Sequence, residues 1–257
     1  MTRTLRWRIL LAWINWVIKL PPWCWILANE PDSAIRIPSH DTIREYQAAI
    51  RAKHEALDGV WCTMDGLKLY LQQSGDATIQ NNFYNGWTHD HYVSAVLVFC
   101  PDGTIPIACY NVPGCIHDST IAEWGNVYKK LENVFNSPVH GKCTVDSAFS
   151  KKRSPFLIKS QQADPDSDDM NAAVVMQAKS MRQSAEWGMR SLQASFPRLK
   201  DRFIYEEFGE RWVMMKMCSL LYNLRARRVG INQIRNTYMS ALAMDANQMF
   251  VGPLLWW

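Results

Sequence analysis

Hydrophobic and polar residues follow two different spacings along the chain, and these spacings divide it into expected strands and helices. Four short runs are dominated by Val, Ile, Cys and aromatic residues, a composition typical of strands. They are residues 59–65, 91–100, 104–112 and 141–146. The turn sequence Pro101-Asp102-Gly103 separates the second run from the third, so we expect these two strands to form a hairpin.

Apolar residues at steps of three and four predict helices elsewhere. In the helix expected at residues 39–59, Ser39 is a candidate N-cap and Gly59 marks the end. In the helix expected at residues 119–135, Thr120 and Glu123 have the pattern of a capping box at the start. The order of these elements predicts an α/β fold, a mixed sheet flanked by helices. The expected helices are residues 39–59, 119–135, 174–196 and 210–228.

The two ends of the chain differ from its middle. The N-terminal residues carry basic side chains before a Trp-rich apolar stretch, which is too short to span a bilayer and is followed by no clear cleavage site for a signal peptidase. We expect an amphipathic helix that packs on the domain, with secretion or a role at a membrane surface as the alternative. The expected organisation is a Trp-rich N-terminal helical segment at 1–34, a main domain at 35–228 and a C-terminal tail at 229–257.

Within the main domain, residues 151–171 contain two prolines and an acidic cluster, which predicts a loop.

Composition narrows the class of protein. A hydrophobic content of 48% with 20% charged residues is typical of a globular domain and argues against disorder. The net charge of +4 gives no strong global signature of nucleic-acid binding, so DNA contacts would depend on local basic patches. The seven cysteines include no CxxC pair and lie mostly in apolar runs, which favours buried thiols in a reducing compartment. A zinc site made of Cys109, Cys115 and His117 is the alternative, although its spacing matches no usual zinc pattern.

Three acidic residues occupy unusual positions. Asp65 and Asp146 each follow an apolar expected strand, and Glu186 lies in the middle of a helix beside its packing face. If the strands are neighbours and the helix crosses them, the three carboxylates converge at one edge of the sheet. Convergent carboxylates need positive charge to stay together, and oxygen ligands of this kind suit Mg²⁺ or Mn²⁺. Two such ions can activate water and stabilise the cleavage of a phosphodiester.

Each acid also has a simpler interpretation. Asp65-Gly66 is a common turn pair, although Leu67 and Leu69 alternate with polar residues after it. Asp146 can cap the element that follows it. Glu186 lies four residues after Arg182 and four before Arg190, so it can belong to a solvated ladder of ion pairs.

Five motifs, in order over about residues 35–228, resemble the DDE-superfamily transposase/endonuclease domain of Harbinger-type elements. Two of them contain the aspartates, one is the Pro-Gly-x-x-His-Asp-Ser signature, one surrounds the glutamate and one forms the closing helix. In chain order they read VWCTMDG with the first aspartate, NVPGCIHDS with the signature and TVDSAF with the second aspartate. RQSAEWGMRSLQASFPRLK with the glutamate and WVMMKMCSLLYNL as the closing helix follow. The chain departs from the family where Cys115 replaces a Ser, in the short spacing between the second and third acids, and in the lack of a helix-turn-helix segment before the domain.

The resemblance implies an RNase H-like fold and a nuclear endonuclease or transposase that hydrolyses and rejoins DNA strands. It assigns catalysis and the binding of two Mg²⁺ or Mn²⁺ ions to Asp65, Asp146 and Glu186, with His117 and Asp118 in support. His117 can equally make a structural hydrogen bond. A separate DNA-reading partner protein would compensate for the missing helix-turn-helix segment, and an oligomer is compatible with this reading. The alternative function is a catalytically idle, transposase-derived module that binds DNA or protein.

Basic residues near the acids are candidates for phosphate contacts. Those expected to bind DNA are Lys151, Lys152, Arg153, Arg182 and Arg190, and further basic bands occur at residues 198–202 and 225–228. A solvated basic face is the alternative for these bands. Aromatic residues in the segment 81–92 could stack on a displaced base or lie in the core.

Overall fold

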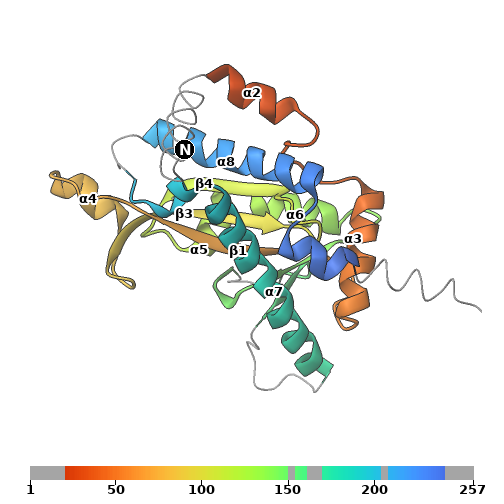
Figure 1. Ribbon diagram of the computed structural model, residues 1–257. Coiled ribbons are helices and arrows are strands. Elements are labelled where there is room, and N and C mark those ends of the chain that lie inside the picture. Colours follow the sequence, from red (N-terminus) through yellow and green to blue (C-terminus); the bar gives the residue numbers. More distant parts are fainter. Residues whose placement is uncertain (1–20, 150–153, 161–169, 204–207, 241–257) are drawn as a thin grey trace, which may run out of the picture.

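A mixed β-sheet runs through the centre of the molecule (Figure 1). The computed structural model describes residues 21–149, 154–160, 170–203 and 208–240, and every structural statement below concerns these residues. In them the sheet has six strands in the order β4-β3-β1-β5-β6, and β2 pairs with the start of β3. The strands are β1 (Val60–Tyr70), β2 (Tyr84–Asn85), β3 (Asp90–Phe99), β4 (Ile107–Pro113), β5 (Lys142–Val145) and β6 (Leu157–Lys159).

The strand directions make the sheet mixed. β1 is antiparallel to β3 and parallel to β5, β3 is antiparallel to β4 as expected for a hairpin, and β5 is parallel to β6. The expected mixed α/β sheet flanked by helices is therefore confirmed. Its strand order and directions match the RNase H-like architecture that the resemblance implies.

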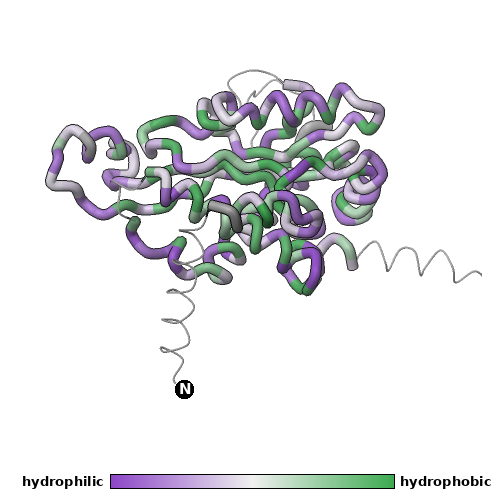
Figure 2. The backbone as a smooth tube through the Cα atoms, turned by 90° about the horizontal axis from the view of Figure 1, so that it is seen from above, coloured by the Kyte–Doolittle hydropathy of each residue, from purple (hydrophilic) through white to green (hydrophobic). Residues whose placement is uncertain are grey.

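Helices cover both faces of the sheet and create two hydrophobic cores. α7 and α8 pack on one face, α5 and α6 pack on the other, and α3 contributes side chains to both cores. Figure 2 shows the hydrophobic strands at the centre and hydrophilic stretches of the helices outside. The helices are α2 (Pro21–Asn29), α3 (His40–Lys53), α4 (Ala77–Phe83), α5 (Asp118–Trp124), α6 (Val127–Phe135), α7 (Met170–Ser195) and α8 (Phe208–Val229).

The long helix α7 follows the predicted spacing. Its buried residues lie three or four positions apart and pack on β1 and β3, which fixes the helix across the sheet. The buried hydrophobic residues among them are Ala178, Met181, Ala185, Met189 and Leu192. The helix ends before Pro197, whose ring is incompatible with a helix interior.

The basic end of α8 holds the segment that follows α2. Arg228 makes ion pairs with Glu30 at 2.8 Å and Asp32 at 2.9 Å, and Arg227 donates to the Asp32 carbonyl oxygen at 2.7 Å. α2 packs on α8. Residues 1–20, most of the expected N-terminal segment, lie outside the described residues. No described helix is long and apolar enough to cross a bilayer.

The structure corrects several element boundaries. β1 does not end at Asp65 but continues to Tyr70. The expected helix 119–135 is two helices separated at Asn126, which has a left-handed conformation with φ 53°, and His117 rather than Thr120 caps the first. The first expected helix ends at Lys53, before Gly59, and the expected loop 151–171 contains β6 and the start of α7.

The chain after α8 returns to the domain. Residues 233–240 are helical, and Ile234 and Tyr238 are buried in the core under α7. The Tyr238 hydroxyl lies 3.3 Å from His54 Nε2 and 3.1 Å from Ser184 Oγ. The described part of the segment expected as a C-terminal tail thus links α3 to α7.

Gly188 lets α7 approach the sheet closely, because a Cβ at this position would lie 2.5 Å from the Phe99 ring. We predict that Gly188→Ala lowers the free energy of unfolding by about 1–2 kcal/mol through overpacking, although alanine is the better helix former. Thermal unfolding measures the change. Gly209→Ala, in α8 with nothing within 4 Å of the added carbon, is the matched control and should be neutral or stabilising. Equal effects of the two substitutions would contradict the close packing.

Candidate active site

Two aspartates lie side by side where β5 ends beside the middle of β1. β1 and β5 are parallel, and Met64 is the register partner of Val145, so Asp65 runs alongside Asp146. Neighbouring strands are about 4.8 Å apart, and the Thr63 hydroxyl donates to the Thr144 carbonyl oxygen directly below the pair. The strand pairing therefore places Asp65 and Asp146 next to each other in the sheet, while the Asp146 carboxylate accepts from the Ser147 N–H at 2.7 Å.

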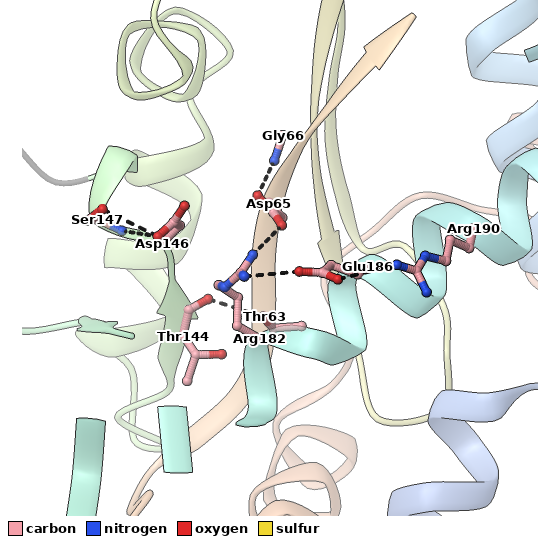
Figure 3. Close-up of polar contacts among 9 residues, drawn as sticks. All are labelled: Thr63, Asp65, Gly66, Thr144, Asp146, Ser147, Arg182, Glu186 and Arg190. Atoms are coloured by element: carbon pink, nitrogen blue, oxygen red, sulfur yellow. Dashed lines mark hydrogen bonds and ion pairs between the residues drawn. The ribbon is translucent and has the colours of Figure 1, made fainter. Parts of the chain in front are cut away.

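Glu186 reaches the same site from α7 through an arginine. Arg182 Nη1 lies 3.0 Å from Asp65 Oδ2, and Arg182 Nη2 lies 3.0 Å from Glu186 Oε1. Two contacts of this length to one guanidinium place the Asp65 and Glu186 carboxylates within roughly 8 Å of each other. Figure 3 shows this chain of ion pairs, with Asp146 beside it just after the end of the neighbouring strand β5.

Asp118 adds a fourth carboxylate, and Gly66 makes room for it. A Cβ at residue 66 would lie 2.6 Å from Asp118 Oδ2, so no other residue fits there without moving that carboxylate. The Asp65-Gly66 pair is therefore not a turn but a point inside β1 where the first residue of α5 rests on the strand backbone. The sequence indicated Asp118 as a supporting residue but gave no reason for the glycine.

Burial dominates the electrostatics of the site. Burial raises the pKa of Asp65 to about 6, although the Gly66 N–H at 2.8 Å and the Arg182 guanidinium both act in the opposite direction. The charges of Asp146 and Asp118 raise it further. Burial also raises the pKa of Asp118, against the charges of His117 and Lys68. These couplings show that Asp65, Asp118 and Asp146 lie in one electrostatic cluster.

The donor set fits a divalent cation, although the side chains are not arranged around one. Among the described residues, no three His, Cys, Asp or Glu side chains are placed to hold a single ion. Oxygen-only ligands suit Mg²⁺ or Mn²⁺, and a cation already lies between two of the carboxylates, namely the Arg182 guanidinium. The residues therefore fit a metal provided that Arg182 leaves this position.

The other expected site residues have different environments. His117 caps α5, because its Nδ1 accepts from the Ser119 N–H at 3.3 Å. Arg190 lies 3.8 Å from Glu186 with 77% of its side chain exposed, so it remains accessible to a phosphate. Arg182 is committed to the two carboxylates. Lys151, Lys152 and Arg153 lie outside the described residues.

Comparison with protein families agrees with this geometry. Residues 64–223, from the position before Asp65 into α8, match the DDE superfamily endonuclease family. The chain belongs to this family. Membership implies nuclease chemistry on DNA and, for the superfamily in general, the use of divalent metal ions. No curated protein matches the chain, and no solved structure matches it.

The raised pKa of Asp65 makes its contribution to stability depend on pH. The folded state binds this proton more tightly than the unfolded chain, whose aspartates titrate near pH 4. Keeping Asp65 charged in the folded state therefore lowers the free energy of unfolding. This loss has its full size above pH 6 and disappears as the pH falls from 6 to 4. We predict that Asp65→Asn raises the free energy of unfolding by about 2–3 kcal/mol at pH 8 and by little at pH 4.

Thermal unfolding at both pH values tests this dependence. Asp58→Asn is the control, since Asp58 is 77% exposed with a 3.5 Å contact to Arg51, and it should change stability by only a few tenths of a kcal/mol at either pH. A gain from Asp65→Asn that is equally large at pH 4 would contradict the burial of a charged carboxylate.

Proposed function

We propose that the protein is a Harbinger-type, metal-dependent DNA endonuclease that hydrolyses phosphodiesters and transfers strands. Asp65, Asp146 and Glu186 would hold two Mg²⁺ or Mn²⁺ ions. The observation that carries the proposal is the parallel pairing of β1 and β5, which aligns Asp65 with Asp146 while Arg182 ties Glu186 to Asp65. Family membership supports the same chemistry.

Each side chain of the site has a distinct task in this proposal. When bound, the ions supply positive charge that favours hydroxide near neutral pH and stabilises the charge that develops on the phosphate. Asp65 and Asp146 present oxygens from fixed strands, and Glu186 completes the set from α7. Asp118, resting on Gly66, adds negative charge that strengthens the attraction for cations. Asp65 has to be ionised to ligate, which happens above pH 6.

Nicking of supercoiled plasmid DNA tests the catalytic assignment. We predict Mg²⁺-dependent nicking that EDTA abolishes and Mn²⁺ restores. Asp146→Asn should slow it by at least about 100-fold, because a ligand that contributes to several kcal/mol of charge stabilisation is lost. Asp58→Asn, on the exposed segment before β1, should nick at the normal rate. Equal nicking by the Asp146→Asn variant and the unaltered protein would remove the catalytic assignment.

One observation favours a second candidate function, a catalytically idle module that binds DNA or protein. Arg182 neutralises Asp65 and Glu186 at 3.0 Å each, so the carboxylates are compensated without a metal. In an active enzyme Arg182 must yield to the incoming ions, and it is then free to contact a DNA phosphate. In an idle module the same ion pairs are simply part of the structure.

Metal binding in the absence of DNA separates the two candidates. We predict that Arg182→Gln increases Mn²⁺ affinity on the order of tenfold, because a competing cation is removed from a partly buried site. Titration calorimetry or the spin-resonance signal of free Mn²⁺ measures the affinity. Arg190→Gln is the matched control with a smaller effect, since Arg190 is mostly exposed and 3.8 Å from Glu186. Absence of Mn²⁺ binding in both variants and in the unaltered protein would support the idle module.

Nuclear residence, a separate DNA-reading partner and oligomerisation belong to the same proposal as properties of Harbinger-type proteins. The Trp-rich N-terminal residues are the feature that would favour secretion instead. The location of a fluorescent fusion of the full chain distinguishes a nuclear protein from a secreted one.

A further inference from the structure

The turn between β2 and β3 presents a tryptophan to solvent. Trp87 is 93% exposed, more than any other large hydrophobic residue among those described. The turn that carries it is built by Asn85, whose Oδ1 accepts from the Trp87 N–H at 3.0 Å, the Thr88 N–H at 3.0 Å and the Thr88 hydroxyl at 3.2 Å. Asn85 therefore fixes the backbone of the turn that presents this indole ring.

This turn is fixed to the segment that leads into the active site. The Asn85 side-chain amide donates to the Gly114 carbonyl oxygen at 2.6 Å, three residues before His117. Cys115 Sγ donates to the Asn82 carbonyl oxygen, and the Arg211 guanidinium lies 5.4 Å from the Phe83 ring. α4 and the β2–β3 turn project from one edge of the molecule (Figure 1), and these contacts hold the projection in a defined place.

An exposed strip connects the projection with the carboxylates. On β1, Lys68 and Tyr70 are exposed and lie on the same face as Gly66, the residue under Asp118. The Lys68 ammonium lies 5.3 Å from the centre of the Tyr92 ring, and its charge also acts on Asp118. Next to them, the Arg202 guanidinium lies 5.6 Å from the Tyr70 ring. Arg202 also pairs with Asp90 at 3.2 Å, and Asp90 is the register partner of Asn85, so Arg202 adjoins the turn that carries Trp87. We call the surface formed by Lys68, Tyr70, Arg202 and Trp87 the aromatic strip.

The dimensions of the aromatic strip suit a length of DNA beside a cleaved bond. Leu97 on β3 is paired with Asp65, and Asp90 lies seven residues back along the same strand. Seven residues of antiparallel strand span about 24 Å, which equals about seven base steps of duplex at 3.4 Å each. Trp87 therefore lies several nucleotides away from the carboxylates rather than at the reacting phosphate.

We propose that the aromatic strip binds an unpaired DNA strand that leads away from the cleavage site, with one base stacked on Trp87. The inference rests on the proposed function, because it takes DNA as the substrate of the adjacent site. Inside a duplex both faces of a base are covered by its neighbours, so an exposed indole can stack only on a base that is unpaired or at an end. Lys68 acts on Asp118 and Arg202 pairs with Asp90, and each would share its charge with a phosphate between bases.

Binding of single-stranded DNA without metal tests the inference independently of cleavage. The probe is a fluorescent oligo(dT) strand of about a dozen nucleotides, followed by anisotropy in EDTA, with the equivalent duplex in parallel. We predict that Trp87→Ala weakens binding of the single strand by about tenfold, within the range for loss of one stacked base. Trp87→Phe should retain most of the affinity. Trp25→Ala removes another exposed tryptophan, on α2, and should change nothing.

Three results would overturn the inference. Unaltered single-strand affinity in Trp87→Ala would exclude stacking on this residue. Equal losses for the single strand and the duplex would indicate a backbone contact instead. A change in sedimentation of Trp87→Ala would identify the residue as a contact between copies of the chain. The anisotropy assay contains no metal, so it does not depend on cleavage. If the protein fails to nick plasmid DNA but Trp87→Ala weakens binding of the single strand alone, the endonuclease proposal is rejected and the single-strand site is retained.

Discussion

The burial of neighbouring carboxylates at one point of the sheet is the constraint on which the rest of the structure depends. Parallel pairing of β1 and β5 fixes the backbones of Asp65 and Asp146 next to each other, and the Asp118 carboxylate lies against the same strand at Gly66. The Arg182 guanidinium offsets part of this cost, and burial, with a smaller contribution from the neighbouring charges, still raises the pKa of Asp65. A protein selected only for stability would gain from replacing these acids, so their arrangement indicates a binding task.

Arg182 also explains why the carboxylates can gather before any metal arrives. Its position on α7, one turn before Glu186, lets a single side chain reach both a strand and its own helix. The sequence pattern predicts an ion-pair ladder or a phosphate contact for Arg182, and the structure shows the ladder together with a longer-range partner, Asp65. Helix spacing predicted the Arg182–Glu186 pair, whereas the pair with Asp65 depends on how α7 crosses β1.

Much of the fold followed from local patterns, because they depend on neighbours in sequence. The apolar stripe of α7 and the position of Asp146 directly after β5 are examples. The continuation of β1 past Asp65 was missed because Asp-Gly is such a common turn, although Leu67 and Leu69 alternating with Lys68 and Tyr70 carried the signal. The role of Gly66 could not be predicted at all, since the atom it accommodates belongs to a residue more than fifty positions away.

The buried hydroxyl of Tyr238, between His54 and Ser184, sets a practical limit on how the chain can be shortened. Family similarity stops at residue 223, and a fragment trimmed to that boundary would lose the aromatic ring that fills the space between α3 and α7. Such a fragment would expose the apolar underside of both helices to water and would be prone to aggregate. Recombinant versions intended for biochemistry therefore need to extend at least through residue 240.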